Sequence, residues 1–182
     1  MVSRVIPVDD FDLVIFGGTG DLARRKILPG LFRRFQAGQM PESARIIGAA
    51  RSDLDSTGYR KDVANALKEF LPETARPHGD GKAVLQQIEY IAIDATGDGG
   101  WKELSSLLRD DIVRAFYFSV APTLFGALAE RLHGYQCSGP ACRIVVEKPF
   151  GRDLESARAL NKTLRDHFDE SQIYRIDHYL GK

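Results

Sequence analysis

The sequence has 182 residues, of which 43% are hydrophobic and 27% are charged, a composition typical of a folded globular domain. Lysine plus arginine and aspartate plus glutamate both total 25, and this balance argues against nucleic acid or an anionic membrane as a partner. No run approaches the roughly 20 apolar residues that span a bilayer, and no basic and apolar leader opens the chain, so we expect a cytoplasmic protein.

Short apolar runs alternate with longer segments of helical spacing, in a strand-then-helix order that repeats along the chain. The runs are continuously apolar, which indicates strands covered on both faces. This order predicts a single α/β domain with a Rossmann-like, doubly wound parallel sheet in three layers. We expect strands at 13–16, 46–49, 88–93, 112–120, 143–146 and 173–176, and helices around 20–37, 57–71, 100–109, 122–134 and 153–168.

Proline and glycine indicate where these elements are interrupted. Pro29 cannot donate a backbone hydrogen bond, so we expect it to break or kink the first helical segment. Residues 72–82 contain two prolines and two glycines and are expected to form a loop.

The first predicted strand runs directly into a glycine-rich turn. A tight turn at this junction lets the backbone approach a pyrophosphate, and the helix that follows points its amide groups at the anion. The order Gly, two residues, Gly, two residues, Ala departs from the commonest dinucleotide pattern, and a purely structural turn would use the same glycines. The position between strand and helix favours cofactor binding by Gly17, Gly18, Thr19, Gly20, Asp21, Leu22 and Ala23, with Arg24 as a further phosphate candidate.

Arg51 and Ser52 follow the second predicted strand, where no carboxylate is present. An acidic residue at this place would bind both ribose hydroxyls of NAD, whereas an arginine beside a hydroxyl supplies a charge-assisted site for the 2′-phosphate of NADP. A solvated surface arginine is the alternative. Taken with the glycine turn, Arg51 predicts that residues 1–182 form an NADP-binding domain.

Three later strand ends supply further candidates. Asp94 and Ala95 follow the third strand, where an adenine could rest, although Asp94 is equally typical of a turn or a helix cap. Pro122 follows the fourth strand, where the chain must turn toward the cofactor. Lys148 ends the fifth strand at the ligand crevice and could donate to a substrate hydroxyl and to the nicotinamide region; an isolated lysine more often points to solvent.

The closing segment carries Asp177, His178, Tyr179 and Lys182. If Asp177 caps a helix, His178 and Lys182 lie four residues apart on one face, above the positive helix end, and form a phosphate cradle. An ordinary Asp-capped helix start would have the same sequence.

Metal binding is not expected. Cys137, Cys142 and His133 lack the paired spacing of a zinc site. Reduced and unpaired thiols are therefore the prediction.

These residues together resemble the glucose-6-phosphate dehydrogenase family. The match covers nearly the whole chain and is carried by the glycine turn, the corner at 50–52, the segment 147–151 and the closing segment 174–182, in the family's order. The closing motif is highly specific, whereas the glycine turn and the Glu-Lys-Pro triplet also occur in other dehydrogenases. Ala121 stands where the family commonly has the first proline of a pair.

The resemblance implies oxidation of D-glucose 6-phosphate at C1 to 6-phospho-D-glucono-1,5-lactone, in the pentose phosphate pathway, with NADP reduced to NADPH. It implies that His178, Tyr179 and Lys182 bind the substrate phosphate, and that Lys148 touches both sugar and cofactor. It implies that Asp177 orients a base histidine. That histidine belongs to the family's C-terminal α+β domain, beyond Lys182, which also makes the subunit contact of a homo-oligomer. We therefore expect these 182 residues alone to bind NADP, to expose apolar surface and to have little or no dehydrogenase activity.

Two other functions stay open on the sequence. Another NADP-dependent sugar or polyol dehydrogenase could share the Glu-Lys-Pro strand end, but a phosphate-free substrate would not need the closing cradle. A non-catalytic NADPH-binding module would keep the dinucleotide site and would gain no activity when the chain is extended.

Overall fold

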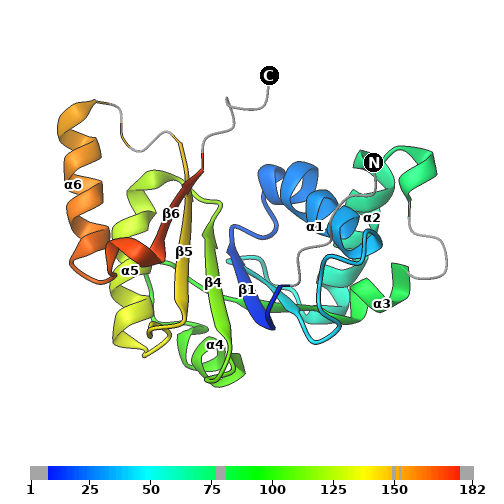
Figure 1. Cartoon of the computed structure of the whole chain (residues 1–182), viewed down its shortest axis with the longest axis horizontal. Coiled ribbons are helices and arrows are strands. Elements are labelled where there is room, and N and C mark those ends of the chain that lie inside the picture. The colour runs from blue at the N-terminus through cyan, green and yellow to red at the C-terminus, as the bar shows by residue number, and fades with distance from the viewer. Residues whose placement is uncertain (1–7, 77–80, 149–150, 152, 177–182) are drawn as a thin grey trace.

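A computed structural model of the chain describes residues 8–76, 81–148, 151 and 153–176, except for the side chains of residues 81 and 82. Its described strands form one six-stranded parallel sheet in the order β3-β2-β1-β4-β5-β6 (Figure 1). The chain therefore starts at the centre of the sheet with β1, moves outward through β2 to β3, and then returns to β4 to build the other half of the sheet. This topology confirms the predicted doubly wound sheet. The strands are β1 (Phe11–Phe16), β2 (Arg45–Ala50), β3 (Ile88–Ala92), β4 (Val113–Phe118), β5 (Cys142–Glu147) and β6 (Ile173–Ile176).

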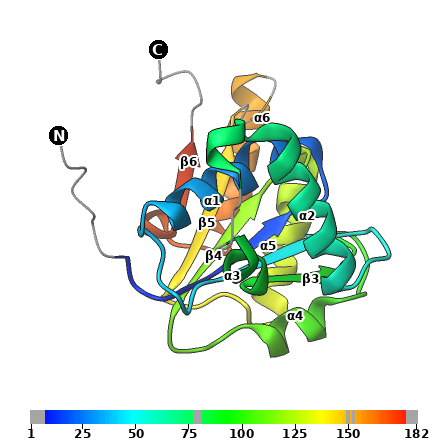
Figure 2. The same cartoon turned by 90° about the vertical axis from the view of Figure 1, so that its right-hand side faces the viewer.

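Helices cover both faces of the sheet, as the two perpendicular views show (Figures 1 and 2). One layer contains α1 (Leu28–Gln36), α2 (Ser56–Phe70) and α3 (Gly81–Gln86). The other contains α4 (Trp101–Leu107), α5 (Phe125–Gly134) and α6 (Leu154–Arg165). The three-layer prediction is confirmed. No helix among the described residues is long and apolar enough to cross a membrane.

Alternation along β1 divides the core into two clusters. Val14 and Phe16 pack with the α4, α5 and α6 layer, and Leu13 and Ile15 pack with the α1, α2 and α3 layer. Because successive strand side chains point to opposite faces, a strand covered on both faces must be apolar throughout. All four of these side chains are at most 8% exposed.

The expectation that every strand is covered on both faces is wrong for β4 and β5. Their residues alternate between buried and half-buried, and Tyr117, Val145 and Tyr174 form one cross-strand row on the less covered face. Tyr174 is 49% exposed. The reason is topological, because α1 to α3 accompany the β1–β2–β3 half of the sheet and leave the opposite half of this face without a described helix (Figure 1).

Two local predictions are also corrected or refined. The segment 72–82 is not wholly a loop, because it contains a 3₁₀ turn at Glu73–Ala75 and the start of α3. The first helical segment is interrupted near Pro29, where a π-helical turn at Ala23–Ile27 gives way to α1. Pro29 lies in the first turn of α1, where a missing N–H is tolerated.

A buried ion pair ties together the amino edge of the sheet. Asp12 in β1 is completely buried and accepts bonds from Arg45 Nη2 and Arg109 Nη2, each at 2.7 Å. Arg109 also donates its backbone N–H to Asp12 Oδ2 at 3.0 Å, and Arg45 donates to the Leu107 carbonyl at 2.6 Å. The strand starts of β1 and β2 and the segment after α4 are thereby joined at one carboxylate.

Gly48 in β2 is required for α2 to approach the sheet. A Cβ atom at this position would lie 2.3 Å from Cζ of Tyr59, closer than packed atoms allow. We predict that Gly48→Ala lowers the free energy of unfolding by about 1–3 kcal/mol, the usual cost of overpacking. Urea unfolding would measure it. Gly30→Ala in α1 is the control, since no atom lies within 4 Å of its added Cβ, and equal midpoints for the two variants would contradict the prediction.

Candidate cofactor site

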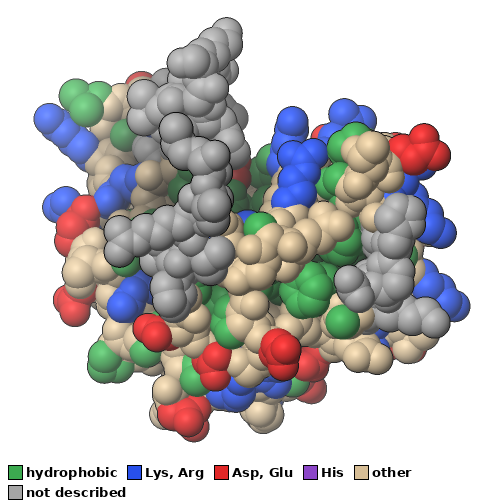
Figure 3. Space-filling view, turned by 45° about the vertical axis from the view of Figure 1, so that its right-hand side comes forward, with side chains coloured by type: hydrophobic (Ala, Val, Ile, Leu, Met, Phe, Trp, Pro, Cys, Tyr) green, Lys and Arg blue, Asp and Glu red, His purple; other side chains and the backbone are tan. Residues whose placement is uncertain are grey.

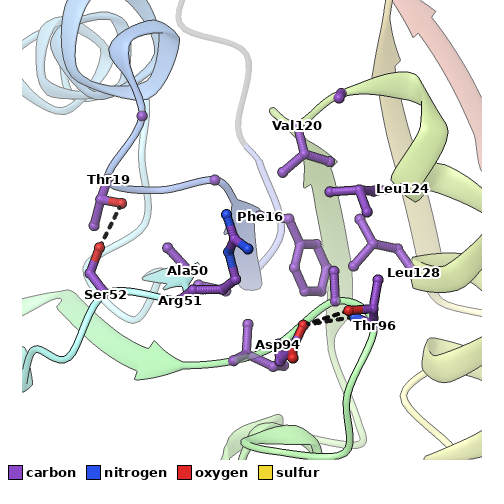
Figure 4. Close-up of a pocket in the computed structure, with 16 residues that line it drawn as sticks. Phe16, Thr19, Ala50, Arg51, Ser52, Asp94, Thr96, Val120, Leu124 and Leu128 are labelled. Atoms are coloured by element: carbon purple, nitrogen blue, oxygen red, sulfur yellow. Dashed lines mark hydrogen bonds between the residues drawn. The ribbon is translucent and has the colours of Figure 1, made fainter.

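The main candidate site is a cavity of about 430 Å³ at the carboxyl edge of the sheet. It lies where the chain order reverses between β1 and β4, the place where ligands bind in open α/β sheets. The glycine turn after β1, the corner after β2 and the segments after β3 and β4 all contribute to its wall (Figure 4). The space-filling view shows Lys and Arg side chains at the top of the right-hand half of the molecule, and Asp and Glu side chains mixed with Lys and Arg at its lower edge (Figure 3).

The glycine turn is pinned to the ends of the neighbouring strands. The N–H groups of Gly17 and Gly18 both donate to the Ala49 carbonyl, at 2.8 and 3.3 Å. Gly17 has φ of +81°, and a Cβ atom there would lie 2.2 Å from the Ser119 carbonyl oxygen. Only glycine fits this position. The amides of Gly17 and Gly18 are thus bonded to β2, and that of Gly20 donates to the Gly17 carbonyl at 2.8 Å. An anion would therefore meet the amides at the start of the helical segment that follows.

The corner after β2 places a guanidinium and a hydroxyl on the cavity wall. Arg51 and Ser52 both line the cavity, and Thr19 of the glycine turn joins them. The Thr19 and Ser52 hydroxyl oxygens lie 3.3 Å apart, within hydrogen-bond distance (Figure 4). The turn and the corner therefore meet at a pair of hydroxyls beside one arginine.

Asp94 lines the same cavity and also organises the turn after β3. Its Oδ1 accepts from the backbone N–H of Thr96 at 2.9 Å and from the Thr96 hydroxyl at 3.0 Å. Its carbonyl accepts from Trp101 Nε1 at 2.8 Å. These Thr96 bonds, with a smaller contribution from the charge of Arg51, hold the pKa of the Asp94 carboxyl below its ordinary value. Asp94 therefore acts as a turn residue, one of the two roles that the sequence left open for it, and it lies at the wall of the cavity.

The opposite wall is apolar. Phe16 at the end of β1 and Leu128 in α5 are almost fully buried, and Val120 and Leu124 complete this side (Figure 4). One wall can thus receive charged and hydroxyl groups while the other receives a flat apolar surface. A nucleotide has both kinds of surface.

Metal chemistry has no candidate ligand set in the described part of the chain, where no three His, Cys, Asp or Glu residues come together. Cys137 and Cys142 are buried as free thiols. Burial raises the pKa of Cys137 to about 11 and that of Cys142 to about 12. Both thiols stay protonated at neutral pH and are poor nucleophiles.

Comparison with known proteins identifies the family. A family model described as "Glucose-6-phosphate dehydrogenase, NAD binding domain" matches residues 14–182. The chain belongs to the glucose-6-phosphate dehydrogenase family. It is 46% identical, over its whole length, to a glucose-6-phosphate 1-dehydrogenase of Rhizobium meliloti, and 45% identical over 96% of its length to one of Gluconobacter oxydans.

Solved structures of this family have the same fold. A glucose-6-phosphate dehydrogenase in complex with its substrate glucose-6-phosphate superposes with a TM-score of 0.85 at 33% identity, over 96% of this chain. The enzyme from Mycobacterium avium gives a TM-score of 0.83 at 34% identity, over 95% of this chain. The chain spans 38% and 37% of the two curated relatives and 37% of each solved chain.

The structure brings half of the predicted cofactor residues of the glucose-6-phosphate dehydrogenase domain to one cavity. Other predicted residues lie outside its wall. Asp21 pairs with Arg25 at 2.7 Å on the surface, and Ala23, in the π-helical turn, is buried. Gly18 and Arg24 line a smaller cavity of about 130 Å³ behind the turn, and Leu22 caps the π-helical turn. Pro122 opens a 3₁₀ turn between two lining residues. The main cavity contains Gly17, Thr19, Gly20, Arg51, Ser52, Asp94 and Ala95.

The predicted substrate residues are less fully placed. Lys148 follows β5, and its backbone N–H donates to the Ile176 carbonyl at 3.2 Å. Beside it, the Tyr117 hydroxyl donates to a Glu147 carboxylate oxygen, joining β4 and β5 at the carboxyl edge. The remaining predicted residues, Asp177, His178, Tyr179 and Lys182, lie outside the described residues.

Sequence reasoning missed the apolar wall and two tyrosines behind the cavity. Leu124 and Leu128 lie in a segment whose helical spacing is the same for a core face as for a cavity wall. Tyr59 and Tyr90 bind carbonyls of the turn and the corner. Nothing in local spacing marks them, because their partners are 38 to 41 residues away in the chain.

Proposed function

We propose that the chain is the NADP-binding domain of a glucose-6-phosphate dehydrogenase. The observation that carries this proposal is the meeting of Arg51, Ser52 and Thr19 at the cavity wall in a chain of this family. The two positions directly after β2 hold Arg51 and Ser52 and no carboxylate, so the corner offers a guanidinium and a hydroxyl to a ribose 2′-phosphate. This set fits NADP, because the guanidinium pairs with the charge of a 2′-phosphate, whereas the 2′-hydroxyl of NAD carries no charge for it to pair with.

The residues of the site would share the work of holding the cofactor. Arg51 would bind the 2′-phosphate through paired, charge-assisted bonds, and the Thr19 and Ser52 hydroxyls would add to them. The amides that begin the helical segment would bind the pyrophosphate. The apolar wall around Leu124 and Leu128 would exclude water from one side of the cavity. NADP, when bound, supplies the hydride acceptor.

The proposed substrate is glucose 6-phosphate. Lys148, which directly follows β5 at the carboxyl edge, would donate to a substrate hydroxyl at the crevice. His178, Tyr179 and Lys182 would hold the substrate phosphate. Asp177 would orient the histidine that removes the hydroxyl proton as hydride leaves C1. That histidine and the subunit contact would belong to a C-terminal domain, as the greater length of the relatives allows.

Activity of the full-length protein tests this function directly. We predict reduction of NADP with glucose 6-phosphate, seen as NADPH absorbance, and reduction at least about 100-fold slower with glucose at the same concentration, because a missing phosphate leaves a charged site unpaired. A dehydrogenase of free sugars or polyols would show the reverse order. Absence of turnover together with tight NADP binding would support a non-catalytic module and overturn the enzyme assignment.

A further inference from the structure

We propose that Tyr59 and Tyr90 are positioning residues that hold the two loops of the cofactor cavity from behind, and that Tyr90 sets the preference for a 2′-phosphate through the corner around Arg51. The inference rests on the proposed function, because it assumes that a dinucleotide occupies the cavity. Neither tyrosine belongs to the wall of the main cavity. Tyr59 lines the smaller cavity behind the turn instead. Any effect of the two tyrosines on a ligand in the main cavity must therefore pass through the backbone they hold.

Tyr59 holds the glycine turn. It lies in α2, is 1% exposed, and donates its hydroxyl proton to the Gly18 carbonyl at 2.9 Å. Two glycines make room for it, since a Cβ atom at Gly18 would lie 2.9 Å from the hydroxyl and one at Gly48 would lie 2.3 Å from the ring. Burial raises the pKa of Tyr59 far above the neutral range, so the hydroxyl remains a donor.

Tyr90 holds the corner on both sides of Arg51. It lies in β3, and its hydroxyl shares one proton between the carbonyls of Ala50, at 3.0 Å, and Ser52, at 2.8 Å. Those carbonyls flank Arg51 in the chain. The hydroxyl thus restrains the peptide group that precedes Arg51 and the one that follows Ser52, on either side of the two residues that line the cavity.

The two tyrosines also contact each other. Their ring centroids lie 4.9 Å apart, with the planes tilted by 37°. On the cavity side, the hydroxyls of Thr19 and Ser52 bridge the same two loops at 3.3 Å. Two contacts therefore fix the spacing between turn and corner. The hydroxyls of Thr19 and Ser52 do so on the side of the main cavity, where a phosphate can reach them. The rings of Tyr59 and Tyr90 do so on the other side, outside the wall of that cavity.

Because each hydroxyl holds a different loop, the two Tyr→Phe variants should behave differently. Tyr90 holds the corner, which carries Arg51 and Ser52, two of the three groups proposed to bind the 2′-phosphate. Tyr59 holds the carbonyl of Gly18, in the turn proposed to approach the pyrophosphate that NAD and NADP share. Tyr90→Phe should raise the Kd for NADP about three- to tenfold, as expected for a lost hydrogen bond, and change the Kd for NAD less than about twofold. Tyr59→Phe should raise both Kd values by a similar factor and leave their ratio unchanged.

The experiment is calorimetric titration of both cofactors into the 182-residue chain and, where the protein continues beyond Lys182, into the full-length protein. Phenylalanine keeps each ring, and thermal unfolding would confirm that each variant is folded. Tyr135→Phe is the matched control, because its ring stacks on Trp101 at 5.9 Å outside the cavity wall and its removal of a hydroxyl should leave both Kd values unchanged. In an Arg51→Ala background, Tyr90→Phe should no longer change the NADP to NAD ratio.

The outcomes separate this inference from the proposed function. A wild-type preference for NADP that Tyr90→Phe leaves intact would overturn the inference and spare the function. Equal weakening of both cofactors by Tyr90→Phe would also overturn it, because that is the signature of general loosening. If the wild-type protein showed no preference for NADP, both the assignment of NADP as cofactor and this inference would be overturned.

Discussion

Replacing Asp12 with alanine is expected to lower the free energy of unfolding by about 3–5 kcal/mol, the usual cost of breaking a buried ion pair by removing one partner. The substitution would remove the carboxylate that Arg45 and Arg109 share and leave them mainly with backbone carbonyl acceptors, which do not balance two charges. Both guanidinium groups are mostly covered, with side chains 23% and 31% exposed, so water can compensate only in part. Equilibrium unfolding in urea would measure the loss.

Asp21→Ala is the matched control, because Asp21 also pairs with an arginine, Arg25, but both side chains are exposed, at 78% and 56%. An exposed pair contributes less than about 1 kcal/mol, so this variant should unfold near the wild-type midpoint. Equal losses for Asp12→Ala and Asp21→Ala would contradict the assignment of Asp12 as the anchor of the amino edge.

The same carboxyl predicts a pH dependence of stability. Burial of Asp12 opposes its ionisation, but hydrogen bonds from Arg45 and Arg109 outweigh burial and hold the pKa below its ordinary value of 3.8. A lowered folded-state pKa contributes stability that is present above pH 3.8 and is lost as the pH falls through the folded-state value. Urea midpoints measured from pH 6 to pH 3 should therefore decline less steeply for Asp12→Asn than for the wild type.

Replacing Arg51 with alanine is expected to weaken NADP binding about 10- to 100-fold, as expected for the loss of charge-assisted hydrogen bonds. NAD has no 2′-phosphate, so its affinity should change less than about threefold. The preference for NADP should therefore disappear. Calorimetric titration of each cofactor into the variant would measure both values.

Arg158→Ala in α6 controls for a general loss of positive charge, because Arg158 is exposed and lies outside the cofactor cavity. It should leave both affinities unchanged at 0.15 M salt, where surface charges are screened beyond about 8 Å. If Arg51→Ala kept the wild-type preference, the 2′-phosphate would have to be bound elsewhere.

The polar wall of the cavity could be predicted from the sequence, because its residues directly follow the ends of predicted strands. The glycine turn follows β1 and Arg51 follows β2, and parallel strands bring their carboxyl ends to one edge. Each residue could thus be placed from its own strand, without knowledge of its partners. The order of the six strands and of the five longer helical segments was predictable for the same reason, since apolar periodicity is a local property. The short helix α3 was not predicted.

What the sequence does not reveal depends on pairs of residues that are distant in the chain. Asp12 reads as one acidic residue at the start of an apolar run, and its partner Arg109 lies 97 residues later. Apolar runs cannot show how many of their faces are covered, so the half-exposed face of β4 and β5 was missed. Tyr59 reads as an ordinary helix residue until the structure shows its hydroxyl bonded to Gly18.

The central claim is that the corner after β2 selects NADP. Calorimetric titration of the wild-type chain with NADP and then with NAD, in one buffer at 0.15 M salt, tests it most directly. We predict that NADP binds at least about 10-fold more tightly, with one site per chain, because Arg51, Ser52 and Thr19 meet at the cavity wall. Equal affinities, or tighter binding of NAD, would contradict the account.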